Sequence, residues 1–355
     1  MTTSDFTFYG KADYFADLAR RIGRAKSGST VTLATMSFIP TDDGIPAVVD
    51  ALCEAAGRGV RVELAVDAYN FLLSKHKIVG PLWFSGELPR SVPAFYREKL
   101  AALERLKASG GHYTVTNVPA RPFMLPFGGR SHIKYSVVDD YVYVGGCNLN
   151  TSRDIDLMAG WQDEAAAAWL RAFATDVRKG RNVRKTLQGR DVTERLGSNT
   201  ELLIDAGVPK QSVIYKKALE LIDEAQESVF ITCQFFPNST TTRHLVAAHR
   251  RGVDITVLFN HPSQHRLHYP LQQAVVWREQ MRSPKVFFAH QLPRGERYLH
   301  AKLIATERGA IIGSHNYVTA GVNFGTAEIA LLRHDPEFAL AALRSLHQEL
   351  SSRAD

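Results

Sequence analysis

The chain has 355 residues, too many for one simple core but suited to two domains of ordinary size. Hydrophobic residues make up 45% of the chain and charged residues 22%, as in globular proteins, so large disordered regions are not expected. The net charge of +7 indicates an anionic partner, either nucleic acid or an acidic membrane surface, unless the protein only has a mildly basic surface with no role.

Cysteine usage and the N-terminus indicate the compartment. The three cysteines, Cys53, Cys147 and Cys233, each lie in an apolar segment, so no disulfide framework is indicated. The first 15 residues lack the basic and apolar regions of a signal peptide, and no run approaches the ~20 apolar residues of a transmembrane helix. We therefore expect a cytoplasmic protein, and peripheral binding to the inner face of the membrane stays open.

The first half alternates predicted helices and strands. Helical spacing of apolar residues predicts a helix over 13–26, and an apolar run predicts a strand over 31–38. A second helix is expected over 45–56 and a second strand over 60–66. This alternation predicts an α/β fold with a parallel component in its sheet.

The second half repeats this order. Predicted helices at 213–226 and 242–250 alternate with predicted strands at 229–236 and 253–259. The sequence RGVRVELAV at 58–66 matches RGVDITVLF at 251–259, with the same turn before the same strand. We expect two similar lobes packed face to face, residues 1–185 and 186–355.

Three segments interrupt the repeat. Residues 70–111 form an insertion with a predicted helix at 95–109. The link at 178–198 is polar and basic, so it is either a solvated linker or a contact with phosphates or headgroups. The apolar loop at 122–127 is either a contact surface or the closure of the interface between the lobes.

The clearest functional signal is a polar motif within residues 130–150. His132 and Lys134 alternate with β-branched and aromatic residues, which predicts a strand with both polar side chains on one face. The chain turns at Asp139, and a second strand ends at a glycine pair before Asn148. A His and a Lys on a buried strand are costly to desolvate without an anionic partner, so the motif predicts an anion site.

The second half contains a copy of this motif within residues 300–316. Its members are His300, Lys302, Glu307, Gly313 and Asn316. In both copies the acidic residue lies seven residues after the histidine, and the first glycine of the turn lies six residues after the acidic residue. Each copy is followed by another strand and a helix rich in Ala and Leu, at 164–173 and 336–350. The duplication argues against a chance occurrence.

Two His, two Lys and two Asn brought together from two lobes make a site for a phosphate ester. The lysines supply positive charge for the non-bridging oxygens, and the asparagines can donate amide hydrogen bonds to them. One imidazole can attack phosphorus to form a phosphohistidine while the other protonates the leaving oxygen. Water or an alcohol then attacks the intermediate. Because the protein supplies the positive charge, we expect no metal and no other cofactor.

Both copies resemble the HxKxxxxD signature of the phospholipase D superfamily, extended by its G-G/S-x-N turn. Each copy is one residue shorter between the acid and the glycine, and the second has Glu307 in place of the usual Asp. The FYGKADYFADL opening and LHAKL at 299–303 are most similar to cardiolipin synthases and their soluble relatives. The resemblance implies two α/β lobes, each a mixed sheet flanked by helices, related by a pseudo-two-fold axis with the active site at their interface.

The resemblance also implies roles for individual residues. His132 would be the nucleophile and His300 the general acid, while the lysines and asparagines of both motifs hold the phosphate. Glu328 and its counterpart Asp156 would orient the histidines, with Asp154 as the rival of Asp156. The motif carboxylates Asp139 and Glu307 would brace the strand turns rather than touch the substrate.

The substrate class remains open between two hypotheses. The first is a phosphatidyltransferase or phospholipase D acting on a glycerophospholipid, favoured by the basic charge and by the apolar stretches at 78–84 and 122–127. The second is a nuclease or other nucleic-acid phosphodiesterase, in which the same charge would follow a nucleic-acid backbone. A non-catalytic binder is disfavoured because every catalytic position is filled. Both motifs lie in one chain, so no oligomer is required.

A histidine-rich stretch at 261–268 offers a metal site as a competing interpretation. Its histidines, His261, His265 and His268, have no Cys or acidic residue at ligand spacing among them. Ordinary histidines of a surface loop are therefore the favoured interpretation.

Overall fold

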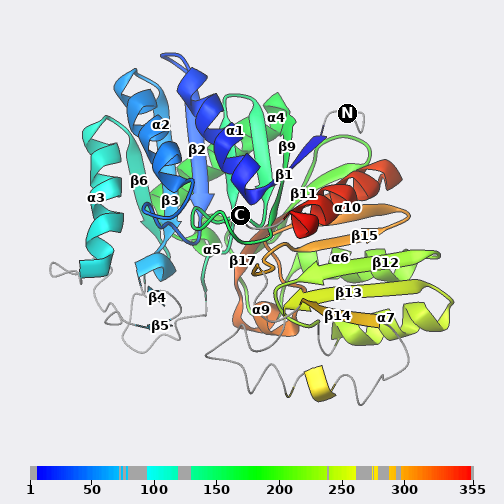
Figure 1. Cartoon of the computed structure of the whole chain (residues 1–355). Coiled ribbons are helices and arrows are strands. Elements are labelled where there is room, and N and C mark those ends of the chain that lie inside the picture. Colours follow the sequence, from blue (N-terminus) through cyan, green and yellow to red (C-terminus); the bar gives the residue numbers. More distant parts are fainter. Residues whose placement is uncertain are drawn as a thin grey trace.

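The computed structural model of the chain contains two mixed β-sheets, each flanked by helices (Figure 1). It describes residues 6–71, 94–118, 129–237, 240–260 and 297–352, with short pieces at 73–74, 77–78, 274, 276–278 and 288–292. No helix in these ranges is both long enough and apolar enough to span a membrane.

The first sheet contains seven strands from the first half of the chain. Their spatial order is β1 (Phe6–Gly10), β9 (Leu157–Gln162), β8 (Tyr141–Gly145), β7 (Tyr135–Val138), β2 (Thr30–Thr35), β3 (Arg61–Asp67) and β6 (His112–Thr116). Strands β2, β3 and β6 are parallel to one another, and the other pairs are antiparallel. Helices α1 (Lys11–Arg24), α2 (Ile45–Gly57) and α3 (Ala94–Ala108) share a hydrophobic core with one face of this sheet.

The second sheet repeats the first and adds one edge strand. Its order is β10 (Val192–Arg195), β11 (Thr200–Ala206), β17 (Ala327–Arg333), β16 (Gly309–Gly313), β15 (Leu303–Thr306), β12 (Ser228–Cys233), β13 (Asp254–Asn260) and β14 (Phe288–Leu292). From β11 onward each strand has its counterpart at the same place in the first sheet. Helices α6 (Val213–Glu224) and α7 (Thr240–Arg250) pack on its outer face.

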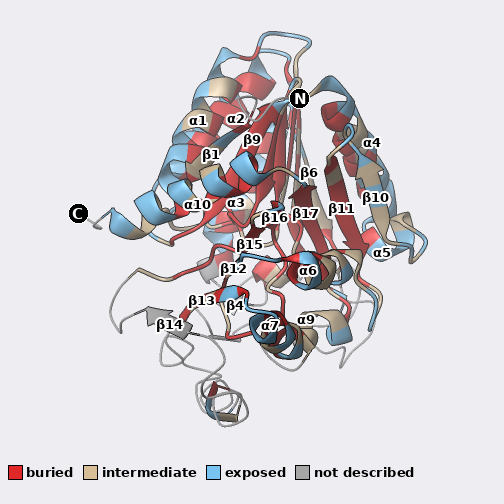
Figure 2. Cartoon of the chain, turned by 90° about the vertical axis from the view of Figure 1, so that its right-hand side faces the viewer, coloured by how far each residue is buried: buried red, intermediate tan, exposed pale blue. Residues whose placement is uncertain are grey.

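The inner faces of the two sheets meet in a third core. Side chains of β7, β8 and β9 pack there against those of β11, β15, β16 and β17. Helices α4 (Glu164–Gly180) and α10 (Pro336–Ser351) belong to the same core. Figure 2 shows the strands largely buried, with exposed positions on the outward sides of the helices. The expected face-to-face packing of two similar lobes is confirmed.

Most predicted helices agree with the structure within two residues at each end, but the structure differs from the expectations at three places. The first unit opens with strand β1 rather than with a helix, and α1 follows it directly. The helix expected over 164–173 continues to Gly180. The link at 178–198 is mostly exposed or half-buried, as a solvated linker would be, but it contains elements that the sequence analysis did not predict: the end of α4, helix α5 (Val183–Thr186) and β10.

The insertion in the first half is described only in part. It contains the 3-10 turn η2 (Ala68–Phe71), the two-residue strands β4 (Leu73–Ser74) and β5 (Lys77–Ile78), and α3. The apolar residues 79–84 and the loop at 122–127 lie outside the described residues. Helix α9 (Thr319–Phe324) follows the second motif.

Phe338 tests the packing of α10 across the two lobes. Its ring is fully buried and lies 5.1 Å from the ring of Phe6 and 5.0 Å from that of Phe8, centroid to centroid. Because the truncation leaves a cavity, we predict that Phe338→Ala lowers the free energy of unfolding by about 3–5 kcal/mol. Leu340→Ala on the same helix is the control, because Leu340 is 53% exposed. Equal losses in the two variants, measured by chemical denaturation, would contradict the packing.

Candidate active site

The first motif reaches the lobe interface just before strand β7. His132 and Lys134 lie in the segment that precedes Tyr135, so the prediction that they sit on the strand itself is wrong. This segment pairs with the start of β17 in the other lobe. Ala327 donates its backbone N–H to the carbonyl of Arg130 at 2.8 Å, and His132 donates to the carbonyl of Ala327 at 2.7 Å. The residue after Ala327 is Glu328.

The second motif repeats this pairing with the lobes exchanged. Ile155 donates its backbone N–H to the carbonyl of Tyr298 at 2.8 Å, and His300 donates to the carbonyl of Ile155 at 2.7 Å. The residue after Ile155 is Asp156. Each histidine therefore lies beside the carboxylate of the opposite lobe, in a register that main-chain hydrogen bonds determine.

Both imidazoles are held by these carboxylates. Nδ1 of His132 lies 2.8 Å from Oε2 of Glu328, and Nδ1 of His300 lies 2.6 Å from Oδ2 of Asp156. The rival Asp154 makes no contact of this kind and pairs with Lys11 instead. Because the carboxylate accepts the Nδ1 proton, Nε2 is the ring atom left for chemistry.

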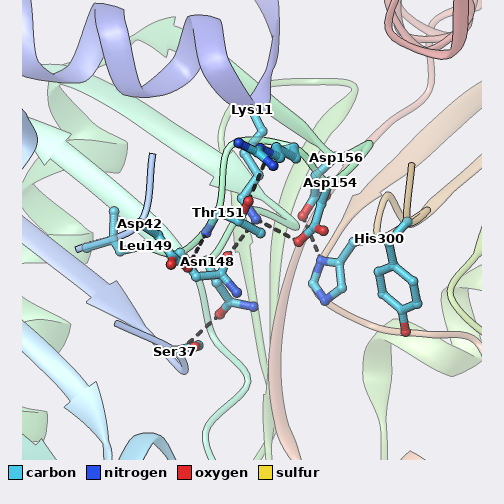
Figure 3. A network of polar contacts seen from close by, with 12 residues as sticks. Lys11, Ser37, Asp42, Asn148, Leu149, Thr151, Asp154, Asp156 and His300 are labelled. Atoms are coloured by element: carbon cyan, nitrogen blue, oxygen red, sulfur yellow. Dashed lines mark hydrogen bonds and ion pairs between the residues drawn. The ribbon is translucent and has the colours of Figure 1, made fainter. Parts of the chain in front are cut away.

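The two rings face a common space. Their centroids are 6.4 Å apart and their planes make an angle of 71°. Figure 3 shows His300 and Asp156 beside the loop that carries Asn148. A tetrahedral phosphorus atom between the rings can be approached by one Nε2 atom while the other lies near the departing oxygen.

Both motif lysines are buried behind the histidines. Lys134 donates to the backbone carbonyl of His132 at 2.6 Å, and Lys302 donates to that of His300. Burial lowers the pKa of Lys134 to about 7 and lowers that of Lys302 as well. An anionic phosphate beside them would raise the pKa of each lysine towards its ordinary value, so both would be fully protonated with the ligand bound.

The two asparagines follow their strands at equivalent places. Oδ1 of Asn148 accepts the backbone N–H of Ser37 at 3.2 Å, which leaves its amide nitrogen to donate to a ligand (Figure 3). Oδ1 of Asn316 is buried and has no hydrogen-bond partner among the residues that the structure describes. Both side chains therefore retain hydrogen-bonding capacity.

The motif carboxylates lie at the strand turns, away from the histidines. Asp139 accepts hydrogen bonds from the backbone N–H of Thr30 at 2.9 Å and from the Ser29 hydroxyl at 3.0 Å. Glu307 accepts from the backbone N–H groups of Gln226 at 2.8 Å and Ser228 at 3.3 Å. Each carboxylate therefore links its own hairpin to the start of the neighbouring strand, β2 in the first lobe and β12 in the second.

A second pair of equivalent residues, missed by the sequence analysis, fixes the chain before each histidine. Asp67 ends β3 and accepts the backbone N–H of Ser131 at 2.7 Å. Asn260 ends β13 and accepts the N–H of Leu299 at 2.8 Å. Extending the match between 58–66 and 251–259 by one residue would have found them.

The tight turns differ between the lobes. A Cβ added at Gly146 would lie 2.1 Å from Oδ1 of Asp156, so this acid requires a glycine beside it. In the second lobe Ser314 takes that place, and its hydroxyl donates to Oε2 of Glu328, the atom that also contacts His132.

Burial dominates the electrostatics of the histidines. Burial, together with Lys134 and Lys302, lowers the pKa of His132 well below 6.5. Burial lowers the pKa of His300 to about 4, and Lys302 contributes to the shift. Both rings are therefore neutral at pH 7, and an anionic ligand would raise both pKa values.

The two carboxylates are shifted in opposite directions. Burial raises the pKa of Glu328 from 4.5 to about 6. Burial alone would also raise the pKa of Asp156, but His300, Lys302 and Lys11 lower it from 3.8 to about 2. The crossed pairs are thus geometrically alike and electrostatically different.

Metal ligation was the competing interpretation for the histidine-rich stretch. His261, His265 and His268 lie outside the described residues. Within the ranges that are described, no group of three or more His, Cys, Asp or Glu is arranged to hold a metal ion.

Known proteins resemble this chain in sequence family and in fold. The chain matches the family described as "Cardiolipin synthase, PLD-like domain" over residues 18–176 and 218–350, one block in each half. No curated protein matches the sequence.

Two solved structures share the fold. The phosphatidylserine synthase of Haemophilus influenzae Rd KW20 has a TM-score of 0.74 at 13% identity, covering 99% of this chain and 87% of that chain. The polyphosphate kinase of Porphyromonas gingivalis has a TM-score of 0.58 at 13% identity, covering 98% of this chain and 50% of that chain.

The opposite pKa shifts predict opposite effects on stability. The folded-state pKa of Asp156 is depressed, so its ionised form stabilises the fold above about pH 4, and this contribution is lost as pH falls towards 2. The folded-state pKa of Glu328 is raised, so stability is lost as pH rises from 4.5 through about 6. Each effect is about 2 kcal/mol at about 1.4 kcal/mol per pH unit.

At pH 7.5 we therefore expect Asp156→Asn to lower the free energy of unfolding and Glu328→Gln to raise it. Both substitutions keep an oxygen that can accept the Nδ1 proton, so the comparison isolates the charge. Chemical denaturation at pH 7.5 measures both values. Destabilisation by Glu328→Gln as large as that by Asp156→Asn would contradict the assignment.

Proposed function

Because the chain belongs to the phospholipase D-like family of the cardiolipin synthase domain, we propose that it cleaves or transfers phosphodiesters of glycerophospholipids through a phosphohistidine. The observation that carries this proposal is the crossed pairing, in which each histidine is held through Nδ1 by a carboxylate of the other lobe. A neutral imidazole with its Nδ1 proton fixed is a nucleophile at Nε2.

In the first step, Nε2 of His132 attacks phosphorus and forms a P–N bond. The bond from phosphorus to the leaving alcohol breaks, and His300 donates its proton to that oxygen. The anionic substrate would raise the low pKa of His300, so that this imidazole binds a proton before it acts as the acid. In the second step, water or an alcohol gives its proton to His300 and attacks phosphorus, which releases His132.

The remaining motif residues stabilise the charge on phosphorus. Lys134 and Lys302 would pair with the two non-bridging oxygens, and the amides of Asn148 and Asn316 would donate to the same atoms. This role is consistent with the depressed pKa values of the buried lysines, which an anionic ligand relieves.

A glycerophospholipid is favoured as substrate over a nucleic acid. The family description and the similarity to a phosphatidylserine synthase support a lipid phosphodiester. The net charge of +7 suits an anionic membrane surface, to which the protein would bind peripherally. The nuclease hypothesis rests on the same charge and on the same chemistry at phosphorus.

The first experiment compares the two substrate classes. Purified protein is incubated with vesicles of phosphatidylglycerol or phosphatidylcholine and with plasmid DNA. We expect cardiolipin or phosphatidic acid to form, and His132→Ala to lower the rate by at least about 100-fold because the nucleophile is lost. His249→Ala is the control, because this histidine is exposed on α7. DNA cleavage without lipid turnover would overturn the lipid assignment and support the nuclease.

The second experiment assigns the nucleophile. Acid-quenched turnover of ³²P-labelled lipid should trap a phosphohistidine at His132, identified by peptide mapping. His300→Ala should slow the breakdown of that intermediate, because His300 activates the second nucleophile. Label trapped at His300 in the wild-type protein would reverse the two roles and leave the reaction class unchanged.

A further inference from the structure

Lys11 is a fully buried lysine that the proposed reaction does not use. It is the first residue of α1 and follows β1 directly. Its Nζ atom donates to Oδ1 of Asn150 at 2.6 Å and pairs with Oδ2 of Asp154 at 3.0 Å. Figure 3 shows Lys11 above the loop that carries Asn148, Asp154 and Asp156. Burying a charged ammonium group is costly unless it is paired, so the contacts of Lys11 need an explanation.

The contacts of Lys11 lie within the turn that presents two site residues. Asn150 is two residues after Asn148, and Asp154 is two residues before Asp156. By binding both, Lys11 ties together the two ends of this turn. A loop fixed at both ends holds the Asp156 carboxylate in one place against His300.

The same turn is fixed from the other lobe by Arg297. Its guanidinium donates to the backbone carbonyls of Arg153 at 2.8 Å and Asp154 at 3.3 Å. It also pairs with Glu349 on α10. Arg297 precedes His300 by three residues, so the Lys11 network and the His300 segment form one connected framework.

The register of the two sheets shows that this framework is specific to the first half. Gly10 pairs with Leu157 in β9, so Lys11 follows at the position opposite Asp156. In the second half Asp205 pairs with Glu328. The two orienting acids therefore have different groups across from them, a charged lysine beside Asp156 and an aspartic acid beside Glu328. Burial raises the pKa of Asp205 to about 8.

We propose that Lys11 is a positioning residue for His300, holding Asp156 as a fixed anion against the imidazole and thereby making the two histidines inequivalent. The proposal rests on the proposed function in one respect: it gives the proton-carrying role to His300, whose partner is a permanent anion. His132 is held by Glu328, whose carboxylate also accepts a hydrogen bond from the Ser314 hydroxyl. This second hydrogen bond weakens the pull of the carboxylate on the imidazole, which suits a neutral nucleophile.

The neighbouring charges support this division. Burial alone would lower the pKa of Lys11, but Asp154 and Asp156 outweigh it and raise the pKa, so the lysine stays charged. Other titratable groups near the Asp156–His300 pair are Lys302, Lys134, His132, Tyr298 and Cys147, and Glu349 lies near Cys147. Glu349 approaches from α10 and is already paired with Arg297.

The test uses Lys11→Met and Asp154→Asn in the full-length chain, with Lys99→Met as the matched control. Lys99 is also buried in the first half, and within the described ranges its hydrogen bonds are to Asn70. Removing the positive charge favours proton binding, so Lys11→Met should raise the apparent pKa of the Asp156–His300 pair by about one unit. Asp154→Asn removes a negative charge and should lower it. Lys99→Met should leave it unchanged.

The titration is read from the ¹³C-labelled His300 ring by NMR, assigned with His300→Ala. Turnover of bis(p-nitrophenyl) phosphate is measured in parallel. Because Lys11 does not touch substrate, Lys11→Met should lower kcat by about 10-fold or more and leave KM within about twofold. If the single variant does not fold, Lys11→Met/Asp154→Asn restores charge balance, and its kcat should still be lowered because the turn is no longer tied.

A folded Lys11→Met with an unshifted His300 midpoint and wild-type kcat would overturn the proposal. So would full recovery of kcat in the double variant, because Lys11 would then only neutralise Asp154. The NMR titration needs no substrate. If the wild-type protein cleaves no phosphodiester, the proposed function fails by itself and the His300 midpoint still decides the role of Lys11.

Discussion

The structure depends on one constraint, the exchange of carboxylates between the two lobes. His132 is held by Glu328 and His300 by Asp156, and in each pair the partners come from opposite halves of the chain. Main-chain hydrogen bonds at Ala327 and Ile155 set the register of these contacts. The apolar core between the sheets holds the lobes together. The histidine–carboxylate pairs and these main-chain hydrogen bonds fix the register of one lobe against the other.

This constraint explains why the site tolerates so much buried charge. Two lysines, two histidines and two carboxylates lie within a few residues of the interface, and each charge faces one of opposite sign or a main-chain carbonyl. Desolvation nonetheless lowers the pKa values of the lysines and imidazoles. The negative charge of a phosphodiester would raise these pKa values, so the site favours an anionic ligand. Affinity for an anion and readiness for acid–base chemistry therefore have the same physical origin.

Much of the fold could be predicted because its signals are local and occur twice. Helical periodicity and the repeated RGV turn located α1, α2, α6 and α7 and the parallel pairs β2–β3 and β12–β13. The secondary structure of the link at 178–198 was not predicted, because its polar composition indicates exposure and says nothing of helix or strand. Strand β10 lies at a sheet edge and alternates between intermediate and exposed residues, so its sequence carries no apolar run.

The sequence predicted which motif residues form the site, but it did not predict which acid contacts which histidine. The motif residues were found by spacing, but each histidine meets an acid 196 or 144 residues away along the chain, and no local pattern encodes that pairing. Lys11 was missed because a lysine at a helix start is ordinary, and only the register of β1 against β9 reveals it opposite Asp156.

A duplicated site within one chain can do what two identical subunits cannot. Identical subunits would surround both histidines with the same residues, so any difference between nucleophile and acid would have to come from the substrate. Here the crossing keeps the two pairs geometrically equivalent while the surroundings differ. Gly146 in the first half is replaced by Ser314 at the equivalent position of the second half. Lys11 is likewise replaced by Asp205. Under the proposed function, the shared geometry suits a reaction whose second step reverses the first, while the different surroundings distinguish the two histidines.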